Sequence, residues 1–163
     1  MTHTAPRESS AAVIVRPVTL EGILGALPLL QAAERHSSPA NPTPVEEQEE
    51  ELRRALTTDS FWLLLAELEG QAAGCASLVR IPKLDRRHGF LFLDELYVAP
   101  EFRQTGVATQ LLGAAQELAR REACAGVRLL VRPANEAARA LYRRLHYVEH
   151  DAILCELRDD PSS

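Results

Sequence analysis

The sequence has few cysteines and no long apolar run, and each shortage excludes a class of protein. Its three cysteines, Cys75, Cys124 and Cys155, are odd in number and far apart, which fits neither a disulfide framework nor a zinc site. Reduced thiols in a cytoplasm are the simplest interpretation, with Cys75 and Cys155 in the core and Cys124 exposed. No apolar run approaches the roughly 18 residues of a membrane span. Residues 1–10 are polar and lack the hydrophobic core of a signal peptide.

Aromatic residues are also scarce, and the rest of the composition is that of an ordinary globular domain. The chain has 163 residues, of which 46% are hydrophobic and 25% charged. This length suits one domain that needs no metal or disulfide to fold. Because aromatic residues make up only 5%, leucine, valine and alanine must fill the core. The formal net charge of −5 argues against general binding of nucleic acid.

The charge is unevenly distributed along the chain. Residues 1–70 contain eleven acidic and five basic side chains, and the acidic ones concentrate in residues 46–51. Residues 101–146 contain eight arginines against four acidic side chains. The first part would therefore favour a cation and the second an anion, although solvated helix faces explain the same pattern equally well.

The hydrophobic pattern predicts alternating strands and helices. Strands are expected at 12–16, 61–68, 72–81, 90–98 and 127–131, followed by a final pair at 147–149 and 152–157. Helices are expected at 19–35, with a kink at Pro28, and at 45–56, 106–121 and 135–145. The order β-α-α-β-β-β-α-β-α-β-β predicts an α/β fold, in which one mixed sheet carries helices on both faces. We expect a single domain over residues 12–157, with flexible ends at 1–11 and 158–163.

The loop from Ala99 to Thr109 leads from a strand directly into a helix. The first backbone N–H groups of a helix lack partners inside it, and with the helix dipole they form a ready anion site. Gly106 and Ala108 are small enough for a phosphate to approach the backbone, and Arg103 adds positive charge at the entrance. An ordinary βα loop with a turn-relieving glycine is the alternative interpretation. The Gly-Lys-Ser/Thr ending of a Walker loop is absent.

Two segments together are more specific than this loop alone. Residues 93–112, LDELYVAPEFRQTGVATQLL, resemble the acetyl-CoA-binding motif of the GNAT superfamily of N-acetyltransferases. Its core pattern, Arg/Gln-x-x-Gly-x-Gly/Ala, is met by Arg103, Gly106 and Ala108. Residues 135–147, NEAARALYRRLHY, resemble that family's second motif, Asn-x-x-Ala-x-x-Leu/Phe-Tyr-x-x-Leu-Gly-Phe. The resemblance covers essentially residues 12–157 and implies the GNAT fold.

The sequence departs from the family pattern at two places. Gln104 and Thr105 replace a frequent Gly-Lys or Gly-Gln pair, and His146 and Tyr147 stand where Gly-Phe is usual. Because the glycine normally relieves a left-handed helix end, we expect His146 to be mildly strained.

The resemblance implies acetyl-CoA as the acyl donor. Two parallel strands, one ending at Val98 and one beginning at Val127, should splay apart and admit the pantetheine arm between them. The pyrophosphate should bind the amides of residues 103–108. The histidines are scattered and form no metal pattern. The residues that the resemblance places at the cofactor are Leu96, Tyr97, Val98, Arg103, Gln104, Thr105, Gly106, Val107, Ala108, Thr109, Asn135, Ala138, Tyr142 and Arg143.

The resemblance also implies catalytic roles. Tyr142 matches the family's tyrosine beside the coenzyme sulfur, which acts as general acid toward the leaving thiolate. Polyamine acetyltransferases carry an acidic pair where Asp94 and Glu95 stand here, and the first acid is their favoured base. Neighbouring residues on a strand point to opposite faces unless a bulge intervenes, so one of the two should face the amine. A core aromatic and solvated strand acids are the alternative interpretations.

Resemblance and charge together predict an N-acetyltransferase that acts on a small cationic amine, such as a polyamine, a diamine, a basic amino acid or an amine antibiotic. The acidic residues 46–51 lie where the family builds its substrate lid, beside the proline-rich loop 37–44. Ribosomal-protein N-terminal acetylases usually carry a glutamate where Leu130 stands, which weighs against peptide substrates. A protein or peptide N-acetyltransferase and a CoA-binding sensor without turnover are the alternatives. Many small members pair through their last strands, so the apolar residues 153–157 suggest a homodimer.

Overall fold

A mixed five-stranded sheet organises the first part of the molecule. The computed structural model describes residues 12–85 and 88–157, and the chain divides after Leu130 into two compact units. The strands of the sheet lie in chain order, from β1 at one edge to β5 at the other. The first four pair antiparallel, and β4 pairs parallel with β5. Their bounds are β1 Ile14–Pro17, β2 Phe61–Leu68, β3 Gln71–Ile81, β4 Phe90–Val98 and β5 Val127–Leu129.

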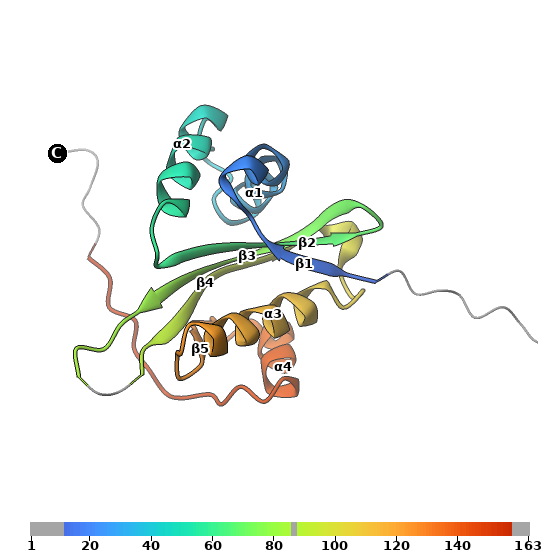
Figure 1. The fold of residues 1–163 in the computed structure, drawn as a ribbon. Helices are drawn as coiled ribbons and strands as arrows, with labels where there is room; N and C mark the ends of the chain where they lie inside the picture. The colour runs from blue at the N-terminus through green and yellow to red at the C-terminus, as the bar shows by residue number, and fades with distance from the viewer. Residues whose placement is uncertain (1–11, 86–87, 158–163) are drawn as a thin grey trace, which may run out of the picture. The chain divides into compact units, whose positions relative to one another are not determined.

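Helices cover both faces of this sheet. The helices are η1 Leu20–Gly22, α1 Ile23–Ser37, α2 Val45–Leu56, η2 Pro100–Phe102 and α3 Val107–Arg121. One face is covered by α1 and α2, and the opposite face by α3 (Figure 1). Pro28, where a kink is expected, lies inside a continuous α1. The predicted α/β architecture, with one mixed sheet and helices on both faces, is therefore confirmed.

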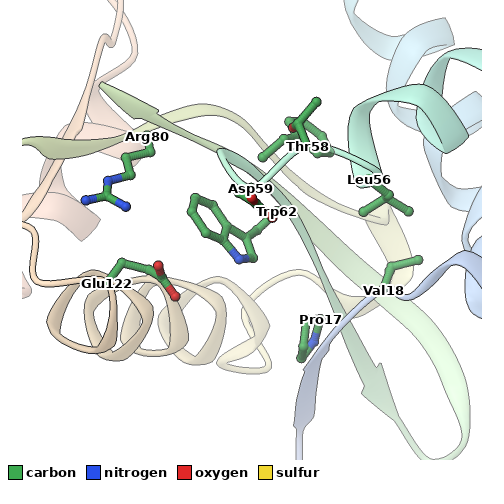
Figure 2. A pocket seen from close by; sticks show the side chains of 9 residues that line it. Pro17, Val18, Leu56, Thr58, Asp59, Trp62, Arg80 and Glu122 are labelled. Atoms are coloured by element: carbon green, nitrogen blue, oxygen red, sulfur yellow. The ribbon is translucent and has the colours of Figure 1, made fainter. Parts of the chain in front are cut away.

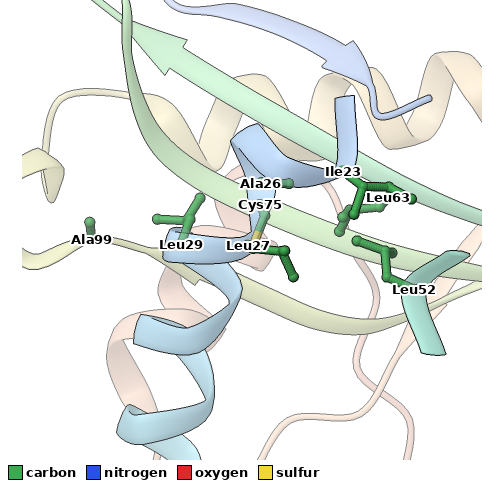
Figure 3. Packing of buried hydrophobic residues seen from close by; sticks show 8 residues of the cluster. All are labelled: Ile23, Ala26, Leu27, Leu29, Leu52, Leu63, Cys75 and Ala99. Atoms are coloured by element: carbon green, nitrogen blue, oxygen red, sulfur yellow. The ribbon is translucent and has the colours of Figure 1, made fainter. Parts of the chain in front are cut away.

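The core beneath α1 and α2 is built from aliphatic side chains, as the scarcity of aromatic residues predicts. α1 contributes four of its apolar residues, and Leu52 of α2, Leu63 of β2 and Cys75 of β3 pack with them (Figure 3). Cys75 is 3% exposed, so its predicted burial is confirmed. Burial, assisted by the nearby Glu95 carboxyl, raises the pKa of the Cys75 thiol to about 12, which keeps it protonated and unreactive at neutral pH.

The second unit contains α4, Glu136–Arg144, and the segment that follows it. Asn135 is the N-cap of α4, and its Oδ1 accepts a hydrogen bond of 3.2 Å from the Ala138 amide. Arg139 donates to both carboxylate oxygens of Glu149 at 3.0 and 2.7 Å. This pair fastens the segment after the helix back onto α4.

The predicted final strand pair is wrong within the described residues. Residues 147–157 form no strand, and Ile153 and Leu157 are 91% and 94% exposed. Cys155, expected in the core, is exposed. Apolar alternation shows only that a segment can form a strand, and the strand exists only where its backbone groups find a ladder partner. For the same reason β5 ends at Leu129, where its pairing with β4 ends, and not at Val131 as predicted.

Candidate active site

A β-bulge interrupts β4 at the acidic pair. Ser77 of β3 pairs with Glu95, whereas its neighbour Leu78 pairs with Leu93, so Asp94 is an extra residue in β4. The Glu95 amide donates a hydrogen bond of 3.1 Å to Ser77 Oγ at this point. A bulge bends a strand and redirects the side chains that follow it.

The bulge changes the face of the sheet to which β4 points its side chains. Before the bulge, Leu93 pairs with Leu78 of β3. Leu78 is on the same side of β3 as Gly74, and a Cβ added at Gly74 would lie 2.8 Å from the Val107 side chain of α3, so this is the α3 face. After the bulge, Tyr97 pairs with Cys75, which belongs to the core under α1. Glu95 therefore shares the α1 face with Tyr97, although regular alternation from Leu93 would have put both on the α3 face as well.

Negative charge gathers around Glu95 on this face. Partial burial raises the pKa of Glu95 above its usual value, and the charges of Asp94 and Glu34 raise it further. Glu34, in the last turns of α1, accepts hydrogen bonds from the Thr43 hydroxyl and from the Thr43 amide at 2.9 Å. These bonds lower the pKa of Glu34 and keep it ionised.

Sequence reasoning missed Glu34. It lies in no motif, and only the folding of the proline-rich loop brings Thr43 to it. The acidic run 46–51 on α2, which the sequence suggested as a source of negative charge, is instead largely paired within its own helix. Glu49 pairs with Arg53 at 2.9 Å, and Arg54 pairs with Glu50 at 3.3 Å and with Glu51 at 2.8 Å. These pairs explain that run as a solvated helix face.

One edge of β4 is open beyond the bulge. β5 pairs only with residues 91–93 of β4, so the two parallel strands part after Leu93. The Ala99 amide donates to Ala73 of β3 at 3.0 Å. Since backbone groups alternate between the two sides of a strand, Leu96 and Val98 direct their N–H and C=O groups away from β3. The expected splay of the two strands is thus present, and at the parted edge Arg103 Nε donates a hydrogen bond of 3.4 Å to the outward Val98 carbonyl.

The loop that follows β4 presents unpartnered amides. No described residue accepts a hydrogen bond from the amides of residues 104–109. Gly106 has φ 89° and is the N-cap of α3, so the loop enters the helix in a left-handed conformation that suits glycine. Gln104, at the first departure from the family pattern, also has a positive φ of 64°. The Thr105 hydroxyl donates to the Phe102 carbonyl at 2.6 Å and stabilises the turn.

The remaining predicted residues belong to the second unit. Tyr142 is the one buried residue of α4, and burial raises the pKa of its phenol, with a further rise from Tyr147. Arg143 lies 3.5 Å from a carboxylate oxygen of Glu136 and 3.9 Å from one of Glu149. Whether Asn135, Arg143 and Tyr142 serve a ligand stays a prediction.

The family model for the acetyltransferase (GNAT) family matches residues 29–147. The chain belongs to this family. This GNAT chain is therefore an acyltransferase, and its mixed sheet and flanking helices are the GNAT fold that the two motifs implied.

Individual relatives resemble this GNAT chain at low sequence identity. An acetyltransferase of Sodalis glossinidius is 27% identical over 111 residues, which is 68% of this chain and 74% of the relative. A solved aminoglycoside N-acetyltransferase in complex with CoA matches with a TM-score of 0.76 at 20% identity, over 95% of this chain and 99% of that one. A ribosomal-protein-alanine N-acetyltransferase from Brucella melitensis matches with a TM-score of 0.72 at 19% identity, over 91% of this chain and 100% of that one.

A cavity of this GNAT chain lies away from the predicted site. It has a volume of about 450 Å³, and Trp62, Arg80 and Glu122 are among its lining residues (Figure 2). None of the predicted site residues lines it. Among the described residues, no three His, Cys, Asp or Glu side chains are grouped to hold a metal ion, and no helix is long and apolar enough to cross a membrane.

Proposed function

We propose that this protein transfers the acetyl group of acetyl-CoA to the primary amine of a small cationic substrate. The observation that carries the proposal is the arrangement at the end of β4. An acidic bulge, an open strand edge and a loop of free amides follow one another along residues 94–109. The acidic bulge suits a cation. The open strand edge suits the extended arm of a coenzyme A thioester, and the loop of free amides suits its phosphates.

The donor site fits acetyl-CoA by its chemistry. The pantetheine arm contains amide groups, which can pair with Leu96 and Val98 as an added strand would. The free amides of residues 104–109, at the positive end of the α3 dipole, match a pyrophosphate. Arg103 Nε lies 3.4 Å from the Val98 carbonyl, so its guanidinium stands between the strand edge and the loop and can contribute positive charge to either.

The acceptor site is assigned to the α1 face of the bulge. We assign the proton-accepting role to Glu95, because the bulge turns it to the α1 face and its raised pKa makes its carboxylate a stronger base. Asp94 and the ionised Glu34 then supply the negative charge that holds an ammonium group. The family precedent for the first acid of such a pair, here Asp94, is the alternative, and the pH profiles of Asp94→Asn and Glu95→Gln distinguish the two.

Acetyl-CoA supplies an acetyl group activated as a thioester. The substrate nitrogen gives one proton to Glu95 and forms the new C–N bond, while the C–S bond breaks. Tyr142 gives its phenolic proton to the departing sulfur, and the second proton released by the nitrogen restores the phenol. Glu95 returns its proton to water, so CoA leaves as a thiol and one proton is released.

The decisive experiment is acetyl transfer across a mixed panel of amines. The panel contains polyamines, basic amino acids, aminoglycosides and short peptides, and acetylated products are counted by mass. Mass detection is needed because Cys155 is exposed and would react with a thiol reagent. We expect turnover with one cationic class and a loss of at least about tenfold in Tyr142→Phe, equivalent to about 1.4 kcal/mol of barrier.

Each other outcome contradicts a definite part of the proposal. Acetylation of peptides alone would favour the protein N-acetyltransferase alternative. Tight binding of acetyl-CoA without turnover on any amine would favour a CoA-binding sensor. Full activity in Tyr142→Phe would remove Tyr142 as the acid but leave the enzyme assignment intact.

A further inference from the structure

The C-terminal end of α4 brings two tyrosines together. The Tyr147 amide donates to the Tyr142 carbonyl at 3.0 Å, and the His146 amide donates to the Arg143 carbonyl at 3.0 Å. His146 has φ 65°, so the chain reverses through a left-handed residue. This pair of hydrogen bonds is the Schellman motif, in which the residue after the left-handed one turns back over the last turns of the helix.

The reversal places one ring against the other. The ring centroids of Tyr142 and Tyr147 are 5.6 Å apart, and their planes are inclined by 56°. This is a favourable tilted geometry for aromatic rings. Two residues later, Glu149 is held by Arg139 through two hydrogen bonds, so the segment that carries Tyr147 is fixed to α4 on both sides of the ring contact.

We propose that Tyr147 is a positioning residue for Tyr142: its ring holds the Tyr142 phenol in the one orientation from which it can give a proton to the leaving sulfur. The inference rests on the proposed function, because it gives Tyr142 the role of acid. A tyrosine side chain can turn about two bonds, and a reacting group displaced by about 1 Å can cost about 100-fold in rate. The backbone of α4 alone leaves those two bonds free, and the Tyr147 ring restricts them.

A double-mutant cycle tests this role against a purely structural one. Tyr147→Leu removes the ring, Tyr147→Phe keeps it, and Tyr142→Phe keeps the partner ring but removes the acid. We expect Tyr147→Leu to lower kcat by about tenfold or more with little change in KM for the amine, and Tyr147→Phe to stay within about twofold of the parent. In the Tyr142→Phe background, Tyr147→Leu should cause no further loss, since no acid remains to be positioned.

The opposite result overturns the proposal. If Tyr147→Leu lowers kcat by the same factor in both backgrounds, Tyr147 serves only to cap and stabilise α4. The free energy of unfolding of each variant, measured in urea, shows how far general destabilisation contributes.

A readout that needs no turnover separates this inference from the proposed function. NMR of ring-labelled tyrosine reports the order of the Tyr142 ring directly, and the chain has only three tyrosines to assign. We expect the Tyr142 signal to change from that of a fixed ring to that of an averaged one in Tyr147→Leu, and to stay fixed in Tyr147→Phe. An unchanged signal in Tyr147→Leu would disprove positioning, whatever the amine panel shows. A changed signal in a protein that acetylates nothing would instead disprove the proposed function.

Discussion

Glu95 is a residue whose protonation is set by its neighbours. Partial burial and the charges of Asp94 and Glu34 all raise its pKa above 4.5. If Glu95 is the base, the acidic limb of kcat/KM lies above pH 4.5, because activity appears only as Glu95 loses its proton. Asp94→Asn removes one negative neighbour, so deprotonation becomes easier and the limb should move to lower pH. A pH profile of kcat/KM measures this, with Glu46→Gln on the exposed side of α2 as the control.

The same experiment decides between the two acids. Glu95→Gln should abolish the acidic limb and most of the activity, whereas Asp94→Asn should only shift the limb to lower pH. If Asp94→Asn abolishes activity and Glu95→Gln only shifts the profile, Asp94 is the base and the family precedent holds. Movement of the limb to higher pH in Asp94→Asn would contradict the charge coupling itself.

Alanine substitution at two glycines should change the free energy of unfolding in opposite directions. A Cβ at Gly74 would lie 2.8 Å from the Tyr97 carbonyl oxygen and 2.8 Å from Val107, where neither backbone nor helix can move cheaply. We expect Gly74→Ala to cost about 1–3 kcal/mol of the free energy of unfolding. Gly113, on the exposed side of α3, has open space around its Cβ position. Gly113→Ala should therefore add about 1 kcal/mol through helix propensity.

Urea unfolding of both variants measures these changes. The substitution is the same in each, so the sign of the effect depends only on its surroundings. A stable Gly74→Ala would mean that α3 does not approach the sheet as closely as the contact with Val107 indicates.

At the scale of the element, two helices end through left-handed residues that are not glycine. Ala123 has φ 52° after α3, and His146 has φ 65° after α4. In both, hydrogen bonds of the Schellman type close the helix end. Because a left-handed conformation costs a residue with a Cβ about 1–2 kcal/mol, Ala123→Gly and His146→Gly should each raise the free energy of unfolding by about 1 kcal/mol. Ala114→Gly inside α3 is the matched control and should lower it by a similar amount.

Thermal and urea unfolding of the three glycine variants measure these changes in the free energy of unfolding. Equal destabilisation by all three glycine substitutions would show that unfolded-state entropy outweighs relief of strain at the helix ends. That outcome would also remove the strain that the sequence predicted for His146 from its departure from the family pattern.

The elements show how much the sequence could predict. α2, β2 and β4 have the bounds that periodicity indicated, because each carries a complete local signal. The bulge at Asp94 could not be predicted, since it depends on the register between β3 and β4 and not on either strand alone. The contribution of Glu34 to the acidic cluster depends likewise on a loop packing against α1. The strand expected at 152–157 was wrong because its partner is not specified by its own sequence.

At the scale of the whole molecule, the exposed apolar side chains of residues 153–157 predict that two copies of the chain associate. Ile153, Leu154 and Leu157 are 91%, 70% and 94% exposed. Several large apolar side chains exposed within five residues are typical of an interaction site. The same segment has strand-forming character but no described strand partner. A second copy of the chain could supply both the missing ladder and the missing apolar contacts.

We therefore expect a homodimer that depends on this segment. Sedimentation over a range of protein concentrations should give a dimer for the parent chain and a monomer for Ile153→Ser combined with Leu157→Ser. Leu84→Ser is the matched control, because Leu84 is fully exposed in the turn between β3 and β4 and should not affect assembly. A dimer that survives the double substitution would place the interface elsewhere. A parent chain that stays monomeric would mean that these side chains remain in water. The protein would then forgo the stabilisation of about 25 cal/mol for each Å² of apolar surface that an interface would remove from water.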